Sequence, residues 1–151
     1  MFALNLPAFQ YKIKSDRGKT MILDTLRHKF VMLTPEEWVR QHFVNYLISY
    51  KGFPPERIVN EAQIMLNGQK RRCDSVLYDK DLNPLVIIEY KAPSVNIDQK
   101  VFEQISAYNW CLKVKYLIVS NGLSHFCCKI DYINHKAEFI PEIPDYSTLL
   151  E

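Results

Sequence analysis

The sequence predicts one α/β domain in which a mixed central β-sheet is flanked by helices and preceded by an N-terminal β-hairpin. Leu85–Tyr90 is an apolar, β-branched run of the kind found in strands buried on both faces. A three-stranded meander precedes a helical segment and a further strand, and this order requires a crossover connection. The 151 residues, 48% of them hydrophobic, suit a single domain over residues 1–151 with one packed core.

The N-terminal β-hairpin is predicted by two short extended segments around a tight turn. These segments are Phe9–Lys14 and Thr20–Leu23, and the residues between them contain an Asp-x-Gly core. We interpret His28–Leu33 as a further extended piece.

The first long helix has a strong start signal. Thr34 is a good N-cap, Pro35 suits the first helical position, and Glu37 occupies the third. We expect the helix to run from Pro35 to about Tyr50 and to end at Gly52.

The remaining elements follow from the same kinds of signal. We expect strands at Arg57–Leu66, Cys73–Tyr78 within an extended Arg71–Tyr78 segment, Leu85–Tyr90, Tyr116–Ser120 and His125–Ile130, a helix at Asn96–Leu112, and turns at Asn67-Gly68 and Asn121-Gly122. The tail, Ile133–Glu151, contains two prolines and is expected to lie extended over the body.

Three charged residues stand where the second hairpin of the meander should be apolar. If the strands fold back about the midpoint of the turn, between Asp81 and Leu82, then Asp74 lies opposite Glu89. Opposed residues have Cβ atoms about 5 Å apart, so two carboxylates there repel each other and favour a cation between them. Mg²⁺ prefers such oxygen ligands, and Mn²⁺ is an alternative. Lys91 lies two residues beyond Glu89 and therefore on the same face.

A simpler interpretation is that these charges form one solvated face of an edge hairpin. The apolar residues Val86–Ile88 argue against it, because they place Glu89 at the end of a buried strand, where an isolated charge is costly.

Asp74, followed after fourteen residues by Glu89-Tyr90-Lys91, resembles the D…(D/E)-x-K signature of the PD-(D/E)XK nuclease superfamily, although Cys73 replaces the proline. Gln104 and Tyr108 are four apart on the next helix and share a face. Without the preceding motif, Gln104 would be interpreted as a solvated residue and Tyr108 as a core residue. Their order resembles an extra motif of these nucleases, which implies that Gln104 supports the active site and that Tyr108 lies near the nucleic acid.

Glu36 and Glu37 open the first helix, where capping and the helix dipole already favour acidic residues. In the families that the chain resembles, an acidic residue of this helix completes the metal site, which implies Glu37, with Glu36 as the alternative. Arg40 shares the face of Glu37 and is expected either to contact a DNA phosphate or to pair with Glu37.

The runs LTPEEWVRQ, RRCDSVLY…IIEYKAP, FEQISAYN and YLIVSNGLSHF occur in an order similar to the N-terminal nuclease domain of type I restriction enzyme R subunits. The resemblance covers the chain to about Ile130 and implies a restriction-endonuclease-like fold. It also implies Mg²⁺-dependent hydrolysis of DNA, with Asp74, Glu89, Lys91 and Gln104 as catalytic residues and Asp74, Glu89 and Glu37 as metal ligands. No helicase motor, methyltransferase or specificity module is visible in the chain.

The net charge of +2 is too small to indicate a nucleic-acid-binding protein by itself, so DNA affinity depends on local clusters such as Lys70-Arg71-Arg72. Arg72 is the expected DNA contact. A protein partner that supplies specificity or a motor, and a homodimer, both remain open. No apolar run approaches the roughly 20 residues that span a bilayer, so we expect no membrane partner.

The four cysteines form no CxxC pair and are expected to be reduced, as in a cytoplasmic protein. No serine or cysteine nucleophile elbow and no glycine-rich phosphate loop is present, which excludes those enzyme classes. Two functions remain: a metal-dependent nuclease, or a non-catalytic DNA- or partner-binding module on the same fold.

Overall fold

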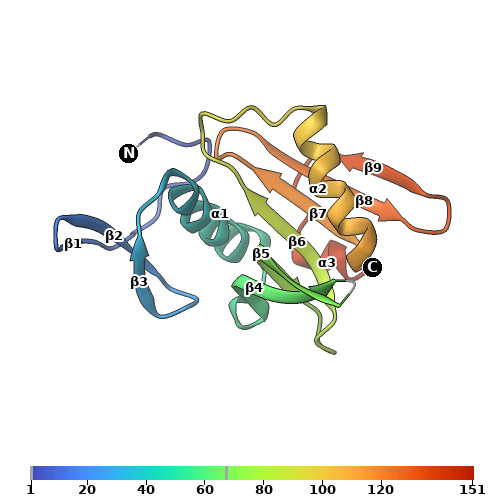
Figure 1. Cartoon of the computed structure of the whole chain (residues 1–151), viewed down its shortest axis with the longest axis horizontal. Coiled ribbons are helices and arrows are strands. Elements are labelled where there is room, and N and C mark those ends of the chain that lie inside the picture. Colours follow the sequence, from blue (N-terminus) through green and yellow to red (C-terminus); the bar gives the residue numbers. More distant parts are fainter. Residues whose placement is uncertain (1, 67) are drawn as a thin grey trace.

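The computed structural model describes residues 2–66 and 68–151, and the side chains of residues 66 and 107–112 lie outside that description. The chain forms a three-stranded sheet and a six-stranded sheet with helices packed around the larger one (Figure 1). The elements are β1 (Ile13–Asp16), β2 (Lys19–Asp24), β3 (Lys29–Met32), α1 (Pro35–Lys51), the short 3₁₀ helix η1 (Pro55–Arg57), β4 (Ile58–Leu66), β5 (Gln69–Tyr78), β6 (Pro84–Tyr90), α2 (Gln99–Leu112), β7 (Tyr116–Ser120), β8 (His125–Asp131), β9 (Lys136–Ile140) and α3 (Tyr146–Leu149).

The six-stranded sheet has the order β4-β5-β6-β7-β8-β9. Only β6 and β7 pair in parallel, and α2 is the crossover between them; the other neighbouring pairs are antiparallel. The predicted mixed central sheet flanked by helices is therefore confirmed.

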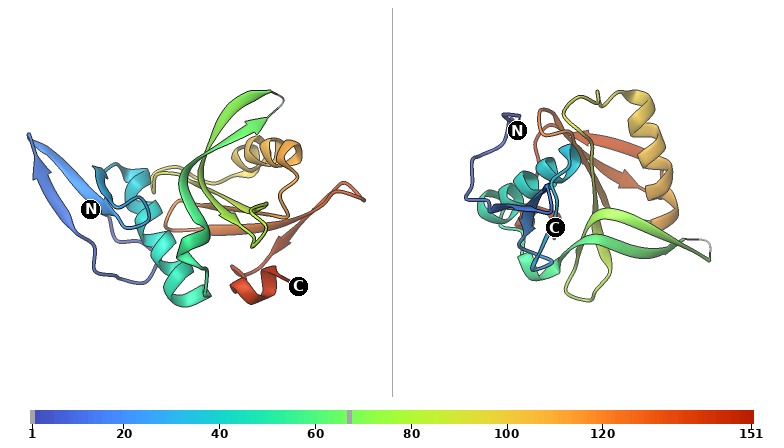
Figure 2. Two further views of the ribbon diagram at one scale, coloured as in Figure 1. Left: turned by 90° about the horizontal axis from the view of Figure 1, so that it is seen from below. Right: turned by 60° about the vertical axis from the view of Figure 1, so that its left-hand side comes forward.

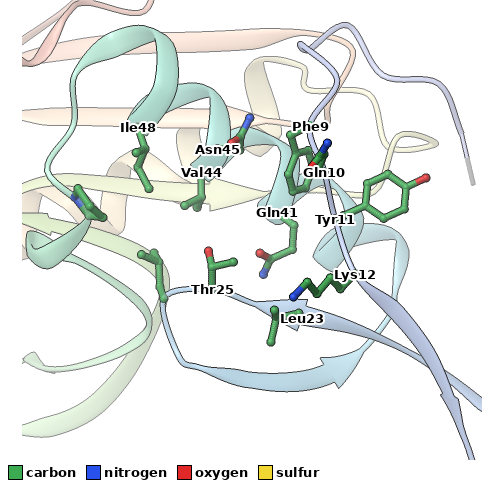
Figure 3. A pocket seen from close by; sticks show the side chains of 12 residues that line it. Phe9, Gln10, Tyr11, Lys12, Leu23, Thr25, Gln41, Val44, Asn45 and Ile48 are labelled. Atoms are coloured by element: carbon green, nitrogen blue, oxygen red, sulfur yellow. The ribbon is translucent and has the colours of Figure 1, made fainter.

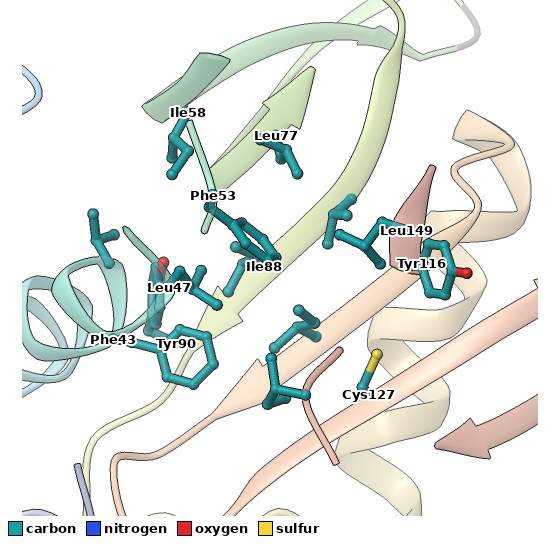
Figure 4. Close-up of a cluster of buried hydrophobic side chains, with 14 of the residues drawn as sticks. Phe43, Leu47, Phe53, Ile58, Leu77, Ile88, Tyr90, Tyr116, Cys127 and Leu149 are labelled. Atoms are coloured by element: carbon teal, nitrogen blue, oxygen red, sulfur yellow. The ribbon is translucent and has the colours of Figure 1, made fainter. Parts of the chain in front are cut away.

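A helix covers each face of this sheet, which explains why β6 is apolar along its length. Val86 and Ile88 pack in a core cluster with Phe43 and Leu47 of α1 (Figure 4). Ile87 points the other way and packs in a second cluster with Phe102 of α2. Burying each such side chain stabilises the fold by about 1.5–3 kcal/mol, so the two clusters hold β6 firmly in the centre of the sheet.

The caps of α1 match the sequence signals. The Thr34 hydroxyl accepts a hydrogen bond from the Glu37 N–H at 3.0 Å, and Pro35 occupies the first turn. Gly52 adopts φ 73°, a left-handed conformation that favours glycine, and its N–H bonds the Leu47 carbonyl.

The N-terminal hairpin gains a third strand, because β3 pairs with β2 on the side away from β1. Arg17 and Gly18 both have positive φ, as the two central residues of a type I′ hairpin turn do. The hairpin projects from the body of the domain (Figure 2, left).

The first strand differs from the expectation: β1 spans Ile13–Asp16 and turns at Arg17-Gly18, instead of spanning Phe9–Lys14.

The start of α2 and the tail also differ from the expectations. α2 begins at Gln99 instead of Asn96, because Asp98 caps it by accepting a hydrogen bond from the Val101 N–H at 2.9 Å. The tail does not merely lie extended over the body: β9 adds to the sheet beside β8, and α3 follows it.

Among the cysteines, Cys73, Cys127 and Cys128 are buried free thiols, whereas the side chain of Cys111 lies outside the described residues. The predicted Asn67-Gly68 turn also falls partly outside them, at Asn67. Within the described chain, no helix is long and apolar enough to cross a membrane.

Candidate active site

The β5–β6 pairing has the predicted register. Ser75 pairs with Ile88 and Val76 with Ile87, so the next position along the ladder sets Asp74 beside Glu89. The Tyr90 N–H donates to Asp74 Oδ2 at 2.9 Å, which fixes the Asp74 side chain across the end of β6.

The two carboxyl groups interact strongly. Burial of Glu89 and the neighbouring Asp74, which also shares a hydrogen bond with it, raise the pKa of Glu89 to about 9, and the charge of Lys91 acts in the opposite direction. Glu89 therefore carries a proton at neutral pH. The charged group of Lys91 lies near enough to lower the pKa of Glu89. Two adjacent carboxyl groups supply the oxygen ligands that hard divalent cations prefer, and such an ion can replace the proton on Glu89. The donor set thus fits Mg²⁺ or Mn²⁺.

A pH dependence of stability follows from the pKa of Glu89. The unfolded side chain has a pKa near 4.5 and the folded one near 9, so between these values the folded protein binds an extra proton. In metal-free buffer the free energy of unfolding is therefore expected to fall as the pH rises from about 4.5 to about 9. Urea unfolding of the wild type and of Glu89→Gln measures this effect, because the variant lacks the titration. Identical pH profiles would contradict the raised pKa.

Gln104 and Tyr108 are the predicted contributions from α2. Gln104 is exposed, and no hydrogen bond in the described part of the chain joins it to Asp74, Glu89 or Lys91. The side chain of Tyr108 lies outside the described residues. Their roles therefore stay predictions.

Glu37 and Arg40 lie in a buried ionic network, each only 6% exposed. Arg40 Nε donates to Glu37 Oε2 at 2.9 Å, which confirms the alternative that these two residues pair. Gln41 donates to the same oxygen, and Arg27 Nη2 donates to Glu37 Oε1 at 3.2 Å. Both oxygens of Glu37 are thus engaged.

The predicted three-carboxylate metal site is consequently not assembled. Within residues 2–66 and 68–151, no three Asp, Glu, His or Cys side chains form a group that could hold a metal ion. Glu36, the other candidate, is exposed in the first turn of α1. Arg40 is also not available to a DNA phosphate, because its remaining nitrogens donate to the Asp74 carbonyl at 2.7 Å and to Glu61 Oε1 at 2.5 Å.

Sequence reasoning did not identify Arg27, Gln41 and Glu61 as members of this network. Glu61 lies opposite Asp74 on β4, where it adopts φ 55° and interrupts the ladder between the Asn60 and Ala62 pairs. The adjacent polar pair Asn60-Glu61, which interrupts the alternation of an otherwise largely apolar strand, was the available signal.

A second series of buried hydrogen bonds reaches β5 at Ser75, the residue next to Asp74. The Tyr90 hydroxyl donates to Ser75 Oγ at 2.9 Å, Ser75 Oγ to Asn60 Oδ1 at 2.6 Å, and Asn60 Nδ2 to Asp24 Oδ2 at 3.0 Å. Asp24 also pairs with Arg27 at 2.6 Å. The N-terminal sheet is thereby connected to the strands that carry Asp74 and Glu89.

A separate cavity of about 580 Å³ lies between the N-terminal segment, β2 and α1 (Figure 3). Gln41, Leu23 and Lys12 are among its lining residues, and Asp74, Glu89 and Lys91 are not. The cavity is therefore distinct from the candidate active site.

Comparison with solved structures identifies similar folds. A fragment described as an HsdR subunit of a type I restriction enzyme from Vibrio vulnificus YJ016 matches with a TM-score of 0.55 and 19% identity over 78% of this chain. The match spans 25% of that chain, so this protein corresponds to about a quarter of it. The structure of a DrdV–DNA complex matches with a TM-score of 0.48 and 17% identity, over 78% of this chain and 11% of the other. No curated protein sequence matches.

The family model described as the N terminus of the type I restriction enzyme R protein (HSDR_N) matches residues 35–144. This range runs from the start of α1 to beyond β9 and includes the β5–β6 pair with its two carboxyl groups. The chain therefore belongs to the type I restriction enzyme R protein N-terminal family.

Proposed function

We propose that this chain is a divalent-metal-dependent nuclease domain that hydrolyses DNA phosphodiester bonds. The observation that supports it most is the pair Asp74 and Glu89, held side by side at the end of a buried strand with Lys91 beside them. Membership of the restriction enzyme R protein family supports the same class of reaction.

Each residue of the candidate active site has a different proposed role. Asp74 and Glu89 would hold Mg²⁺ or Mn²⁺, and Glu89 must give up its proton for the ion to bind. The bound ion would lower the pKa of a water molecule and polarise the scissile phosphate. Lys91 would stabilise negative charge that develops on that phosphate. Gln104 is exposed on α2 and free to contact the attacking water or the substrate, with Tyr108 proposed near the DNA.

A second function is a non-catalytic DNA- or partner-binding module. It is favoured by the engagement of Glu37 with two arginines, which removes Glu37 from the proposed ligands and leaves Asp74 and Glu89. In either case we propose DNA as the main partner. We also propose a protein partner that supplies a motor or sequence specificity.

A plasmid cleavage assay separates the two functions. Wild-type protein should convert supercoiled plasmid to nicked or linear DNA in Mg²⁺ or Mn²⁺ and should not do so in EDTA. Asp74→Asn is the matched control, because its amide oxygen can still accept the hydrogen bond from Tyr90 while the negative charge is lost. No cleavage by the wild type with either ion would support the non-catalytic module. Equal cleavage by the wild type and by Asp74→Asn would show that Asp74 takes no part in the reaction.

Arg72 is the expected DNA contact on β5, the strand that carries Asp74. Its side chain is 63% exposed and only 3.7 Å from Glu61, a loose ion pair that a phosphate could replace. Arg72→Ala should reduce the slope of log K against log salt for DNA binding by about 0.9, the value for one phosphate contact. Fluorescence anisotropy over a salt series measures the slope. An unchanged slope would mean that Arg72 is not a phosphate contact.

A further inference from the structure

The β1–β2 hairpin concentrates positive charge. We call residues 12–20 the basic hairpin: Lys12, Lys14, Arg17 and Lys19 are all exposed, and Asp16 is the only acidic residue among them. The whole protein has a net charge of +2, so the chain outside this hairpin is close to neutral.

The charges of the basic hairpin are not compensated. None of the ion pairs found among the described residues involves its four cationic side chains. Lys14 lies instead over the ring of Phe30, with Nζ 4.3 Å from the ring centroid. Cationic groups that form no ion pair are free to bind an anionic partner, and the four cations outnumber the single carboxylate of Asp16.

Arg17 is an unusual residue at its position. It adopts φ 51° at the first central position of the turn, where asparagine, aspartate or glycine is normally preferred. The turn geometry therefore does not explain an arginine at this position. The positive charge at the tip of the hairpin is not required for the turn to form.

The basic hairpin lies well apart from strands β4 and β5 in the views of Figures 1 and 2. The β4–β5 hairpin carries its own exposed cluster, Lys70-Arg71-Arg72, which leads along β5 into Asp74. A long polyanion such as duplex DNA could contact the two separate clusters at once. The basic hairpin also lies before residue 35, outside the part of the chain that the family model matches.

We propose that the basic hairpin is a second contact surface for the phosphate backbone of duplex DNA, separate from the cluster on the β4–β5 hairpin. The inference rests on the proposed function for its choice of DNA as the polyanion. Lysines are flexible point charges, which suits contacts to phosphates without sequence readout. The basic hairpin thus adds affinity and orientation but no sequence preference.

The test compares two triple variants that each lose three positive charges. In the hairpin variant Lys14→Gln and Lys19→Gln are combined with Arg17→Asn, because asparagine suits a positive φ and should preserve the turn. In the control variant three exposed lysines elsewhere are replaced: Lys80→Gln, Lys129→Gln and Lys136→Gln. Binding to a fluorescein-labelled DNA duplex is followed by anisotropy in EDTA over a salt series. The hairpin variant should lose up to about 2.7 in the salt slope, at about 0.9 per contact, and the control should match the wild type.

The inference is overturned if the hairpin variant binds as tightly as the wild type with the same slope, or if both variants lose affinity equally. It is also overturned if the hairpin variant loses binding to phosphatidylserine-containing vesicles but not to DNA, because the surface would then serve a membrane. Since EDTA prevents metal-dependent cleavage, the result does not depend on nuclease activity. Loss of DNA binding in the hairpin variant of a protein that never cleaves DNA would reject the proposed function alone.

Discussion

Lys91→Ala is expected to lose cleavage by about 10²- to 10³-fold while still binding a divalent ion. Lys91 is not a ligand in the proposed site; its charge lowers the pKa of Glu89 and would stabilise charge on the scissile phosphate. Removing the positive charge of Lys91 relieves its repulsion of the ion but also makes deprotonation of Glu89 harder, so the two effects oppose each other and the ion affinity should change little. Removing the group that stabilises the transition state, by contrast, slows the chemical step. Single-turnover cleavage and calorimetric titration of Mn²⁺ together measure the two effects.

The matched control is Lys80→Ala, an exposed lysine in the turn between β5 and β6. It should cleave and bind the ion as the wild type does. If Lys91→Ala cleaves DNA as fast as Lys80→Ala, Lys91 does not take part in the reaction. If it loses the ion as well, Lys91 shapes the metal site instead of stabilising the phosphate.

Arg40→Ala is expected to destabilise the fold by about 3–5 kcal/mol, the usual cost of removing one partner from a buried ionic group. Arg40 joins α1 to β4 and β5 through Glu37, Glu61 and the Asp74 carbonyl. Without it, Glu37 keeps only Arg27 and Gln41, and the Asp74 carbonyl loses its side-chain donor. Urea unfolding followed by circular dichroism measures the loss.

Two further variants make this result specific. Arg57→Ala removes an arginine that also joins distant elements, through one 2.8 Å hydrogen bond to the Tyr146 hydroxyl, and should cost only about 0.5–1.5 kcal/mol. Adding Glu37→Gln to Arg40→Ala should recover part of the loss, because it neutralises a buried charge that lacks a partner. Equal destabilisation by Arg40→Ala and Arg57→Ala would show that the network contributes no special stability.

The parts of the structure that sequence predicted well depend on local signals. The turn residues between β5 and β6 define the fold-back point, so the register that sets Asp74 beside Glu89 could be derived from residue numbers alone. The cap of α1 was equally local. By contrast, β9 was missed because its residues do not alternate between buried and exposed positions. Its place in the sheet depends on its pairing with β8.

The role of Glu37 shows where sequence reasoning about the site stops. Helical spacing correctly placed Arg40 beside Glu37. Whether that glutamate faces a metal ion or other cations depends on Arg27, which comes from a different element, and on Glu61, which draws Arg40 toward β4. Such contacts between distant segments leave no periodic trace in the sequence.

Calorimetric titration of Mg²⁺ and Mn²⁺ into the wild type and Asp74→Asn tests the central claim most directly. The wild type should bind the ion near pH 7.5 and release about one proton per ion, because Glu89, with a pKa of about 9, must deprotonate. Proton release is read from the dependence of the heat on buffer ionisation enthalpy, and Asp74→Asn should bind far more weakly. Absence of binding to the wild type, or the same isotherm for both proteins, would contradict a metal site at Asp74 and Glu89.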